Sequence, residues 1–386
     1  MNQNHHIEDR FSLPLFRRRG ISLVKGKNAH VWDESGKEYI DCTSGHGVAG
    51  IGHANPAIIR ALTEQAGEIM TCTGSFYHPL RAAYIERLVS IAPKNLKSVF
   101  LCNSGTESIE AALKFARISS GKKEFIAAVN GFHGRTMGAL SATWNPAYRD
   151  DFNPLVPGFQ FVDYNDIQSF KNAVNAETAA VILEIVQGEG GVRLADGAYL
   201  RQVQDICRQK GVLLIVDEVQ TGFGRTGRMF ACEHHQIEPD LLCLSKSIAG
   251  GFPMGAVLCS DKIIVAYGKH GSTFGGNPLA CAVSLATINY IIENDLPIAA
   301  GRKGKHLVDS FKRSELSIVN EVRHLGLMIG IALDRPAQPY IDELQKEGVL
   351  VIPAGADVIR LLPPLTIDNS DIDIVVDKLH TVLSKG

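Results

Sequence analysis

The chain has 386 residues, of which 45% are hydrophobic and 21% are charged, a composition typical of globular proteins with about two or three domains. This composition excludes intrinsically disordered, collagen-like and disulfide-scaffold proteins. Lys and Arg number 39 against 41 Asp and Glu, and the resulting net charge of -2 offers no basic field for nucleic acid or an anionic membrane. We therefore expect neither nucleic acid nor a membrane among its partners.

Eight cysteines are scattered along the chain without any C-x-x-C pair, and several lie in apolar runs, as Cys243 and Cys259 do. Buried thiols in a reducing compartment explain this pattern better than disulfides or a zinc cluster. The first ten residues are polar and contain no signal-peptide core, and the apolar stretch at 247–259 is too short to span a bilayer. We expect a cytoplasmic protein without a bound metal.

Short apolar runs alternate with longer amphipathic segments between residues 51 and 294. The amphipathic segments predict helices over residues 56–70, 80–91, 106–119, 198–210 and 278–292. The apolar runs predict strands over residues 98–102, 125–129, 179–184, 212–216, 241–245 and 256–260. Because these runs are uniformly apolar rather than alternating, we expect strands that are buried on both faces of the sheet. Strands that alternate with helices predict an α/β fold with a doubly wound, mostly parallel sheet.

The pattern changes near residue 295. Beyond this point, strands are predicted over residues 318–322, 327–333, 349–352 and 358–362, and helices near 337–347 and 370–384. We expect residues 51–294 to form a large domain and residues 295–386 a smaller α+β domain. Residues 1–50 contain short strands joined by a Gly turn and are too few to fold alone, so we expect them to join the smaller domain.

The first candidate site follows the apolar run at 98–102. Ser104 and Glu107 have the spacing of a capping box at the start of a helix. Gly105 exposes backbone N–H groups which, together with the helix dipole, offer a binding site for phosphate. The alternative is an ordinary N-cap that binds no ligand.

The second candidate, Asp217, follows the run at 212–216. A carboxylate at the end of a buried strand needs a positive partner or a strong hydrogen-bond donor, although an Asp that only caps a turn remains the alternative. Gly222, Gly224 and Gly227 match the dinucleotide fingerprint G-x-G-x-x-G. We reject that interpretation because the glycines open no amphipathic helix and the acidic residues precede them.

The third candidate, Lys246, follows the run at 241–245 and precedes a segment without another charge until Asp261. Such surroundings disfavour the ammonium form and lower the pKa, as a Schiff-base lysine requires. A lysine in a solvated turn is the alternative. Together, a phosphate-binding turn, a carboxylate and a lysine at neighbouring strand ends are the groups that hold pyridoxal phosphate (PLP). We expect PLP as the cofactor.

With these groups in place, the sequence resembles the class III, fold-type I PLP-dependent aminotransferases. The resemblance extends from about Gly26 to the C-terminus and is closest to acetylornithine aminotransferases and to related enzymes that act on acetylated or carrier-linked lysine precursors. It implies the PLP transferase fold and a homodimer with composite active sites. The motifs that carry it lie at residues 103–108, 132–136, 184–191, 217–227, 245–256, 270–278 and 358–365.

The resemblance also implies roles for individual residues. Lys246 would be the Schiff-base lysine and Asp217 the partner of the pyridine nitrogen. Cofactor contacts are implied for Ser104, Gly105, Thr106, Phe132, Gln220 and Thr273, the last of these across the dimer interface. Contacts with substrate are implied for Arg135, Arg360, Glu189 and Ser272. Arg135 and Arg360 match two arginines that bind substrate carboxylates, and Glu189 matches the acid that pairs with the second arginine.

The reaction implied is transamination between 2-oxoglutarate and an N-acetylated or carrier-linked ω-amine of ornithine or lysine type, in arginine or lysine biosynthesis. One departure from the family pattern is Ile185, where relatives carry proline. The alternatives are other class III enzymes, such as ornithine or 4-aminobutyrate aminotransferase, a semialdehyde aminomutase or a dialkylglycine decarboxylase. An NAD-dependent dehydrogenase and a non-catalytic binding protein are more remote alternatives.

Overall fold

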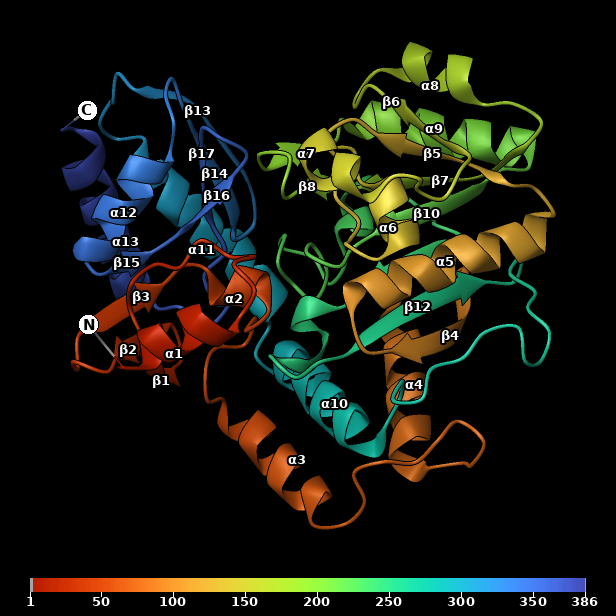
Figure 1. Cartoon of the computed structure of the whole chain (residues 1–386), viewed down its shortest axis with the longest axis horizontal. Helices are drawn as coiled ribbons and strands as arrows, with labels where there is room; N and C mark the ends of the chain where they lie inside the picture. Colours follow the sequence, from red (N-terminus) through yellow and green to blue (C-terminus); the bar gives the residue numbers. More distant parts are fainter. Residues whose placement is uncertain (1–2, 386) are drawn as a thin grey trace.

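The computed structural model describes residues 3–385, and the N-terminal and C-terminal parts of the chain lie on the same side of the molecule, at left in Figure 1. After helix α1 (Gln3–Phe11), strands β1 (Leu23–Lys27), β2 (His30–Asp33) and β3 (Glu38–Asp41) form an antiparallel set, and β15 (Val349–Leu350) joins β3 in parallel. A short helical turn, α2 (Ser44–Gly47), follows. The predicted short strands near the N-terminus therefore form one sheet with a strand from the C-terminal part of the chain.

The largest sheet has seven strands in the order β4-β12-β11-β10-β7-β5-β6. The pairs from β11 to β6 are parallel, whereas β12 runs antiparallel to both of its neighbours. The prediction of a mostly parallel sheet is confirmed, although the sequence did not indicate the reversed strand. The strands are β4 (Leu96–Cys102), β5 (Glu124–Ala128), β6 (Phe159–Val162), β7 (Thr178–Glu184), β10 (Leu213–Asp217), β11 (Leu241–Leu244) and β12 (Gly255–Ser260).

Helices cover both faces of this sheet, as its uniformly apolar strands predict. Leu213 and Ile215 of β10 belong to the apolar cluster that contains α5, whereas Leu214 and Val216 belong to the cluster that contains α9 and α10. The helices around the sheet are α3 (Pro56–Ala66), α4 (Pro79–Ile91), α5 (Gly105–Ser120), α6 (Met137–Ala142), α7 (Pro146–Arg149), α8 (Ile167–Ala173), α9 (Gly197–Lys210) and α10 (Pro278–Glu293). Short 3₁₀ turns are η1 (Asp150–Phe152), η2 (Ala231–His235) and η3 (Lys246–Ala249).

The C-terminal part contains a second, antiparallel sheet in the order β13-β14-β17-β16. Its strands are β13 (Val319–Leu325), β14 (Met328–Leu333), β16 (Ile352–Ala354) and β17 (Val358–Leu361), and its helices are α11 (Leu296–Phe311), α12 (Gln338–Lys346) and α13 (Asn369–Leu383). Helix α11 was not predicted. A side chain at Gly304 would lie 1.8 Å from the carbonyl oxygen of Gly326, so close packing requires glycine there and weakens the helical sequence pattern.

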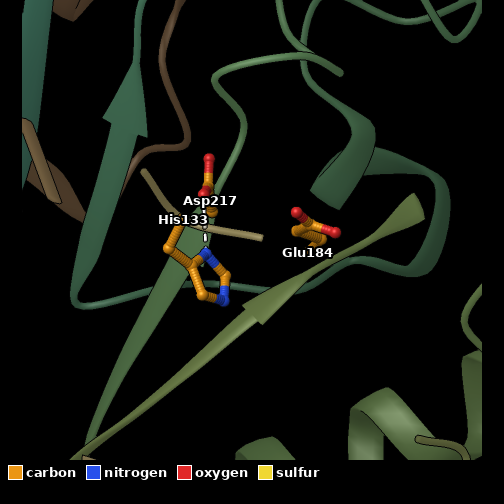
Figure 2. A group of neighbouring side chains, drawn as sticks. All are labelled: His133, Glu184 and Asp217. Carbon is orange, nitrogen blue, oxygen red and sulfur yellow. Dashed lines mark hydrogen bonds and ion pairs between the residues drawn. The ribbon is translucent and has the colours of Figure 1, made fainter. Parts of the chain in front are cut away.

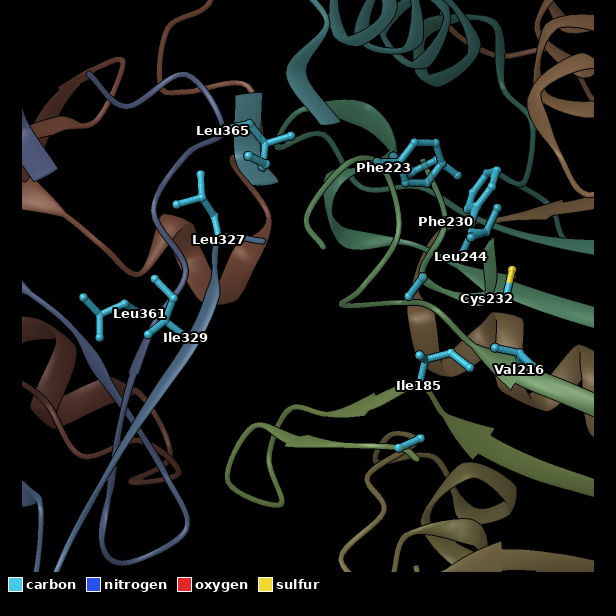
Figure 3. Close-up of a cluster of buried hydrophobic side chains, with 14 of the residues drawn as sticks. Ile185, Val216, Phe223, Phe230, Cys232, Leu244, Leu327, Ile329, Leu361 and Leu365 are labelled. Carbon is cyan, nitrogen blue, oxygen red and sulfur yellow. The ribbon is translucent and has the colours of Figure 1, made fainter. Parts of the chain in front are cut away.

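A continuous apolar core joins the two sheets (Figure 3). Leu327, Ile329 and Leu361 of the C-terminal part belong to the same cluster as Val216 and Phe223, which lie at the end of β10 and in the turns beyond it. Across this shared core, Arg360 of β17 reaches Gln220, which lies shortly after the end of β10. A small ribbon of β8 (Val186–Gln187) and β9 (Arg193–Leu194) lies between them.

Two further features concern the thiols and the helices of the described residues. All eight cysteines are free thiols, and seven of them are buried. Within residues 3–385, no helix is long and apolar enough to cross a bilayer.

Candidate active site

A cavity of about 200 Å³ lies where β4, β5, β7, β10 and β11 end, at the edge of the sheet where ligands of open α/β sheets bind. We call it the Lys246 cavity. The turns after these strands supply its wall, and several residues predicted to act together line it. The lining residues are Gly105, Thr106, Phe132, His133, Gly134, Glu184, Val186, Gly188, Glu189, Asp217, Val219, Gln220, Thr221, Ser245 and Lys246.

Lys246 enters the cavity from the turn that follows β11. Its backbone has φ +48°, a left-handed conformation that costs a non-glycine residue about 1 kcal/mol and that recurs at functional sites. Burial lowers the pKa of Lys246 below its usual value, and the carboxylates of Glu189 and Asp217 only partly offset this effect. The neutral amine is the nucleophilic form, so the surroundings of Lys246 suit covalent chemistry.

Asp217 is the last residue of β10 and is buried beside Lys246. One carboxylate oxygen accepts the backbone N–H of Val219 at 2.9 Å, and the other lies 2.7 Å from Nδ1 of His133 (Figure 2). The sequence predicted that this carboxylate needs a partner but did not identify the histidine. His133 lies inside the motif at 132–136, so this motif could have indicated His133 as the partner of Asp217.

Glu184 ends β7 next to this pair (Figure 2). One of its oxygens accepts the backbone N–H of Phe132 at 3.4 Å, and the other, Oε2, is buried and has no hydrogen-bond partner within residues 3–385. Burial raises the pKa of Glu184 well above its ordinary value, and the charge of Asp217 raises it further. Glu184 therefore offers an unused polar atom to a ligand in the cavity, a role that was not predicted.

Ligand atoms of His133, Glu184 and Asp217 lie within 4.8 Å of one another, close enough to hold a metal ion. Both oxygens of Asp217 already have hydrogen-bond partners. Within residues 3–385, Oε2 of Glu184 and Nε2 of His133 have no hydrogen-bond partner.

The N-terminus of α5 closes another side of the cavity. Oγ of Ser104 accepts the N–H of Glu107 at 3.3 Å, as the capping-box spacing predicts, while Glu107 accepts the N–H of Asn103 at 2.6 Å. A side chain at Gly105 would lie 2.7 Å from Val219, so the close approach of this turn requires glycine. Gly105 and Thr106, the first two residues of α5, line the cavity, so their backbone N–H groups and the helix dipole favour a phosphate there.

Arg360 approaches the Lys246 cavity from β17, in the other sheet, and is completely buried. It contacts two residues that line the cavity: its Nη2 lies 2.7 Å from Oε1 of Glu189, and its Nη1 donates to Oε1 of Gln220 at 3.1 Å. Burial raises the pKa of Glu189, but the positive charges of Arg360 and Lys246 outweigh burial and hold this pKa below its usual value. The predicted pairing of Glu189 with the second arginine is present in the structure.

Three residues predicted for the site lie away from the Lys246 cavity. Arg135 is exposed and stacks on Tyr148, 3.9 Å from the ring centroid. Ser272 accepts a hydrogen bond from the side chain of Asn103 at 3.1 Å, next to the turn that begins α5. Thr273 is exposed on the loop between β12 and α10. Of these, Thr273 was expected to act in the site of a second subunit.

The dinucleotide interpretation fails in the structure as it did in the sequence. Gly222, Gly224 and Gly227 lie in a series of turns that opens no α-helix. Ile185, the departure from the family pattern, is buried in the main core, and its carbonyl oxygen accepts the N–H of Ala195 at 3.0 Å.

Comparison with known proteins identifies the family. The family described as Aminotransferase class-III matches residues 17–383. The chain belongs to the class III aminotransferases. This class III aminotransferase is 45% identical to the acetylornithine aminotransferase of Methanopyrus kandleri over 379 residues, which cover 97% of each chain. It is 43% identical to the LysW-aminoadipate semialdehyde transaminase of Deinococcus radiodurans over 382 residues, which cover 98% of this chain and 89% of that one.

Solved structures agree with the fold of this class III aminotransferase. Ornithine aminotransferase from Toxoplasma gondii matches with a TM-score of 0.95 and 31% identity, covering 99% of this chain and 94% of that one. Acetylornithine aminotransferase from Elizabethkingia anophelis matches with a TM-score of 0.88 and 30% identity, covering 99% and 98%. The Toxoplasma structure is described with PLP at its active site. The protein is a PLP-dependent aminotransferase with the predicted α/β fold.

The chemistry of the residues around the Lys246 cavity fits the functional groups of PLP. An amine whose pKa is lowered suits the aldehyde of the cofactor, and a buried carboxylate backed by His133 suits its ring nitrogen. The turn at Gly105 admits no side chain and exposes N–H groups that suit the phosphate. The unpartnered Oε2 of Glu184 leaves one further polar contact available.

Proposed function

We propose that this enzyme transfers an amino group from the ω-amine of an N-acetylated or carrier-linked ornithine or lysine to 2-oxoglutarate, in arginine or lysine biosynthesis. The named functions of the relatives from Methanopyrus kandleri and Deinococcus radiodurans support this substrate class. The observation that carries the proposal is the ion pair between Arg360 and Glu189, which lies at the wall of the cavity that holds Lys246. The site must accept glutamate, which has a carboxylate beside the reacting carbon, and also an ω-amine, which has none there. Such a site needs a cation that an acidic side chain can either cover or leave free.

When bound, PLP withdraws electrons from the carbon that carries the amino group. Asp217, held by His133 and by the N–H of Val219, supplies the negative charge that keeps the ring nitrogen protonated. The amine of Lys246 would hold the cofactor and then move the proton at the reacting carbon, because its lowered pKa favours the neutral amine, which is the form that accepts a proton. Phe132 and Val219 line the same cavity, and we propose that they pack against the ring.

The two arginines divide the recognition of carboxylates in this proposal. With an acylated ω-amine bound, Glu189 covers Arg360 and Arg135 binds the remote carboxylate. With glutamate bound, Glu189 swings away and Arg360 binds the carboxylate beside the reacting carbon. Glu189 is 30% exposed at its side chain, whereas Arg360 is completely buried, so the acid is the partner with room to move.

We also propose a cytoplasmic homodimer with composite active sites. Tyr77 and Phe76 lie exposed before α4, and Tyr267 and Phe274 lie exposed on the loop that carries Thr273. Arg81 joins these two segments by donating to the carbonyl oxygens of Phe76 at 2.9 Å and Gly276 at 2.7 Å. These exposed aromatic side chains next to Thr273 support a second copy of the chain as the partner. The eight free thiols support a reducing compartment.

A panel of amino donors tests the proposed function. N2-acetylornithine, N2-acetyllysine, ornithine and 4-aminobutyrate are each supplied with 2-oxoglutarate, and kcat/KM is compared because this ratio measures discrimination. We expect an N2-acetyl donor to rank first and glutamate to form in equal amount to the donor consumed. Ornithine or 4-aminobutyrate in first place contradicts the proposed substrate class, and absence of glutamate contradicts transamination.

The role of Lys246 is tested on the same protein. Borohydride reduction of the loaded enzyme followed by peptide mass mapping should find the pyridoxyl group on Lys246. Lys246→Ala should lose turnover by at least about 1,000-fold, as the loss of a covalent catalytic group does. The matched control Lys210→Ala removes an exposed lysine at the end of α9 and should leave turnover unchanged. An adduct at another lysine contradicts the assignment.

A further inference from the structure

A second cavity of about 220 Å³ adjoins the Lys246 cavity, and Phe132 and Glu189 line both. Its wall also includes Trp144 and Tyr148, from the segment between α6 and the end of α7. A water molecule takes about 30 Å³ of liquid volume, so this space exceeds what the three heavy atoms of an acetyl group would fill.

Arg135 connects the second cavity with the recognition of substrate. Its guanidinium lies 3.9 Å from the ring centroid of Tyr148 and 5.6 Å from that of Phe132. In an N-acylated amino acid, the remote carboxylate and the acylated nitrogen are attached to the same carbon atom. A carboxylate held by Arg135 therefore directs the acyl group toward Tyr148 and the second cavity. The indole N–H of Trp144 donates to no group within residues 3–385 and is available to the acyl carbonyl.

Two guanidinium groups lie at the wall of the second cavity. Arg193 and Arg323 line it together with Asp357 and with Glu189, which is paired with Arg360. The side chain of Arg323 is only 14% exposed, and its Nε contacts Glu321 at 3.3 Å.

The terminal nitrogens of Arg323 remain free. They donate to no group among the residues from 3 to 385, and Nη1 lies 3.8 Å from where a side chain at Gly191 would begin. A largely buried guanidinium with free donors is suited to bind a carboxylate.

We propose that the second cavity binds the N-acyl group of the amino donor and that Arg323 selects an acyl group that carries its own carboxylate. This inference rests on the proposed function, because it assumes a donor whose α-nitrogen is acylated. N2-succinylornithine and N2-acetylornithine provide a matched pair of probes, since both have the same reacting amine and α-carboxylate. Only the succinyl group has a second carboxylate.

The experiment compares kcat/KM for the two donors with 2-oxoglutarate in the loaded enzyme. We expect the wild type to prefer N2-succinylornithine by about 10-fold or more, the effect of one charge-assisted hydrogen bond. Arg323→Gln should lower the succinyl-to-acetyl ratio by about the same factor. Arg335→Gln, which removes an exposed arginine paired with Asp334 after β14, is the matched control and should leave the ratio unchanged.

A binding measurement provides a readout apart from turnover. N2-succinylnorvaline and N2-acetylnorvaline lack the reacting amine, so their inhibition constants report recognition of the acyl group alone. The same preference and the same loss in Arg323→Gln are expected. The inference is overturned if the enzyme turns over N2-acetylornithine and N2-succinylornithine equally well. It is also overturned if Arg323→Gln leaves the succinyl-to-acetyl ratio of kcat/KM unchanged. In both cases the proposed function stands. Ornithine used in preference to both acylated donors overturns the proposed function and the inference with it.

Discussion

Arg360 carries a positive charge in a completely buried position, and its environment explains how that charge is tolerated. Glu189 lies 2.7 Å away and Gln220 accepts a further hydrogen bond, so the guanidinium is neutralised without water. Removing one partner of a buried ion pair leaves an uncompensated charge, which is costly. A substitution that keeps the charge at position 360 is therefore the informative one.

We predict that Arg360→Lys impairs the reaction with glutamate more than the reaction with the acylated amine. Lysine keeps the charge but cannot make a bidentate contact with a carboxylate. The half-reaction with glutamate should therefore slow by about 100-fold, and the half-reaction with N2-acetylornithine by less than about 10-fold. Rapid-mixing measurements of each half-reaction check this. Arg335→Lys is the matched control, and equal losses for both substrates would contradict the division of roles.

Glu184 predicts a pH-dependent contribution to stability. Burial raises its pKa well above the ordinary value, with a further rise from Asp217. A carboxyl whose folded-state pKa exceeds its unfolded value contributes stability that is present below the unfolded pKa and is lost as the pH rises through the folded pKa. Glu184→Gln removes this titration, so it should stabilise the cofactor-free protein more at pH 8 than at pH 5, by up to about 1.4 kcal/mol per unit of pKa shift.

Unfolding midpoints at the two pH values measure this effect. Glu177→Gln, at an exposed position between α8 and β7, is the control and should give no such pH dependence. An equal gain for Glu184→Gln at both pH values would show that Glu184 titrates normally in the folded protein.

At the scale of elements, the N-terminus of α5 combines a structural cap with a proposed phosphate site. We predict that Ser104→Ala costs about 1 kcal/mol of stability through the lost cap and also weakens PLP binding. Asp196→Ala is the matched control, because Asp196 caps α9 by accepting the N–H groups of Ala198 at 2.8 Å and Tyr199 at 2.9 Å, away from the Lys246 cavity.

Thermal unfolding and the dissociation constant of PLP separate the two roles of Ser104. Both variants should unfold at lower temperature, but only Ser104→Ala should release PLP more readily. If both variants hold PLP with the same affinity, the turn before α5 acts as a cap alone.

The end of β10 shows how one strand serves two purposes. Asp217 is the last residue of β10 and Glu218 is the first residue beyond it, and their side chains contact different parts of the molecule. Asp217 faces the cavity, whereas Glu218 accepts the N–H groups of Ala231 at 2.7 Å and Cys232 at 2.8 Å and so fixes the turns beyond the strand. Burial raises the pKa of Glu218 to about 7. Asp217 is therefore the residue that serves the site, and Glu218 is the residue that stabilises the turns.

At the scale of the whole molecule, the exposed position of Thr273 predicts sharing between subunits. In a mixed dimer of Lys246→Ala and Thr273→Ala subunits, the subunit that keeps its lysine receives an intact Thr273 from its partner. We predict that this mixed dimer has about half the wild-type activity and normal affinity for PLP, because one of two sites is complete.

The reciprocal arrangement is the control. Wild-type subunits paired with subunits that carry both substitutions should bind PLP weakly, because the only lysine then faces a partner without Thr273. Purified mixed dimers with two different affinity tags allow both measurements. If the first mixed dimer is the impaired one, Thr273 acts within its own chain.

The order of residues along the chain was enough to predict every strand of the large sheet except its edge strand β6, and also the chemistry at the ends of the predicted strands. Runs of buried residues at 212–216 and 241–245 predict strands, because only burial on both faces explains such uniformly apolar stretches. A polar residue directly after each run lies at the carboxyl edge of a parallel sheet. The sequence therefore predicts, without further information, that Asp217 and Lys246 lie near one another.

Local sequence patterns could not predict which residues from distant parts of the chain come into contact, because these contacts depend on the folded chain. His133 joins Asp217 across 84 positions, Arg360 reaches Glu189 from a different sheet, and β12 runs opposite to its neighbours. The second cavity beside Phe132 likewise has walls from segments far apart in the chain. These contacts depend on the order and direction of strands, which the packing of the whole core selects. Local patterns of apolar and polar residues record burial but carry no information about which neighbour covers them.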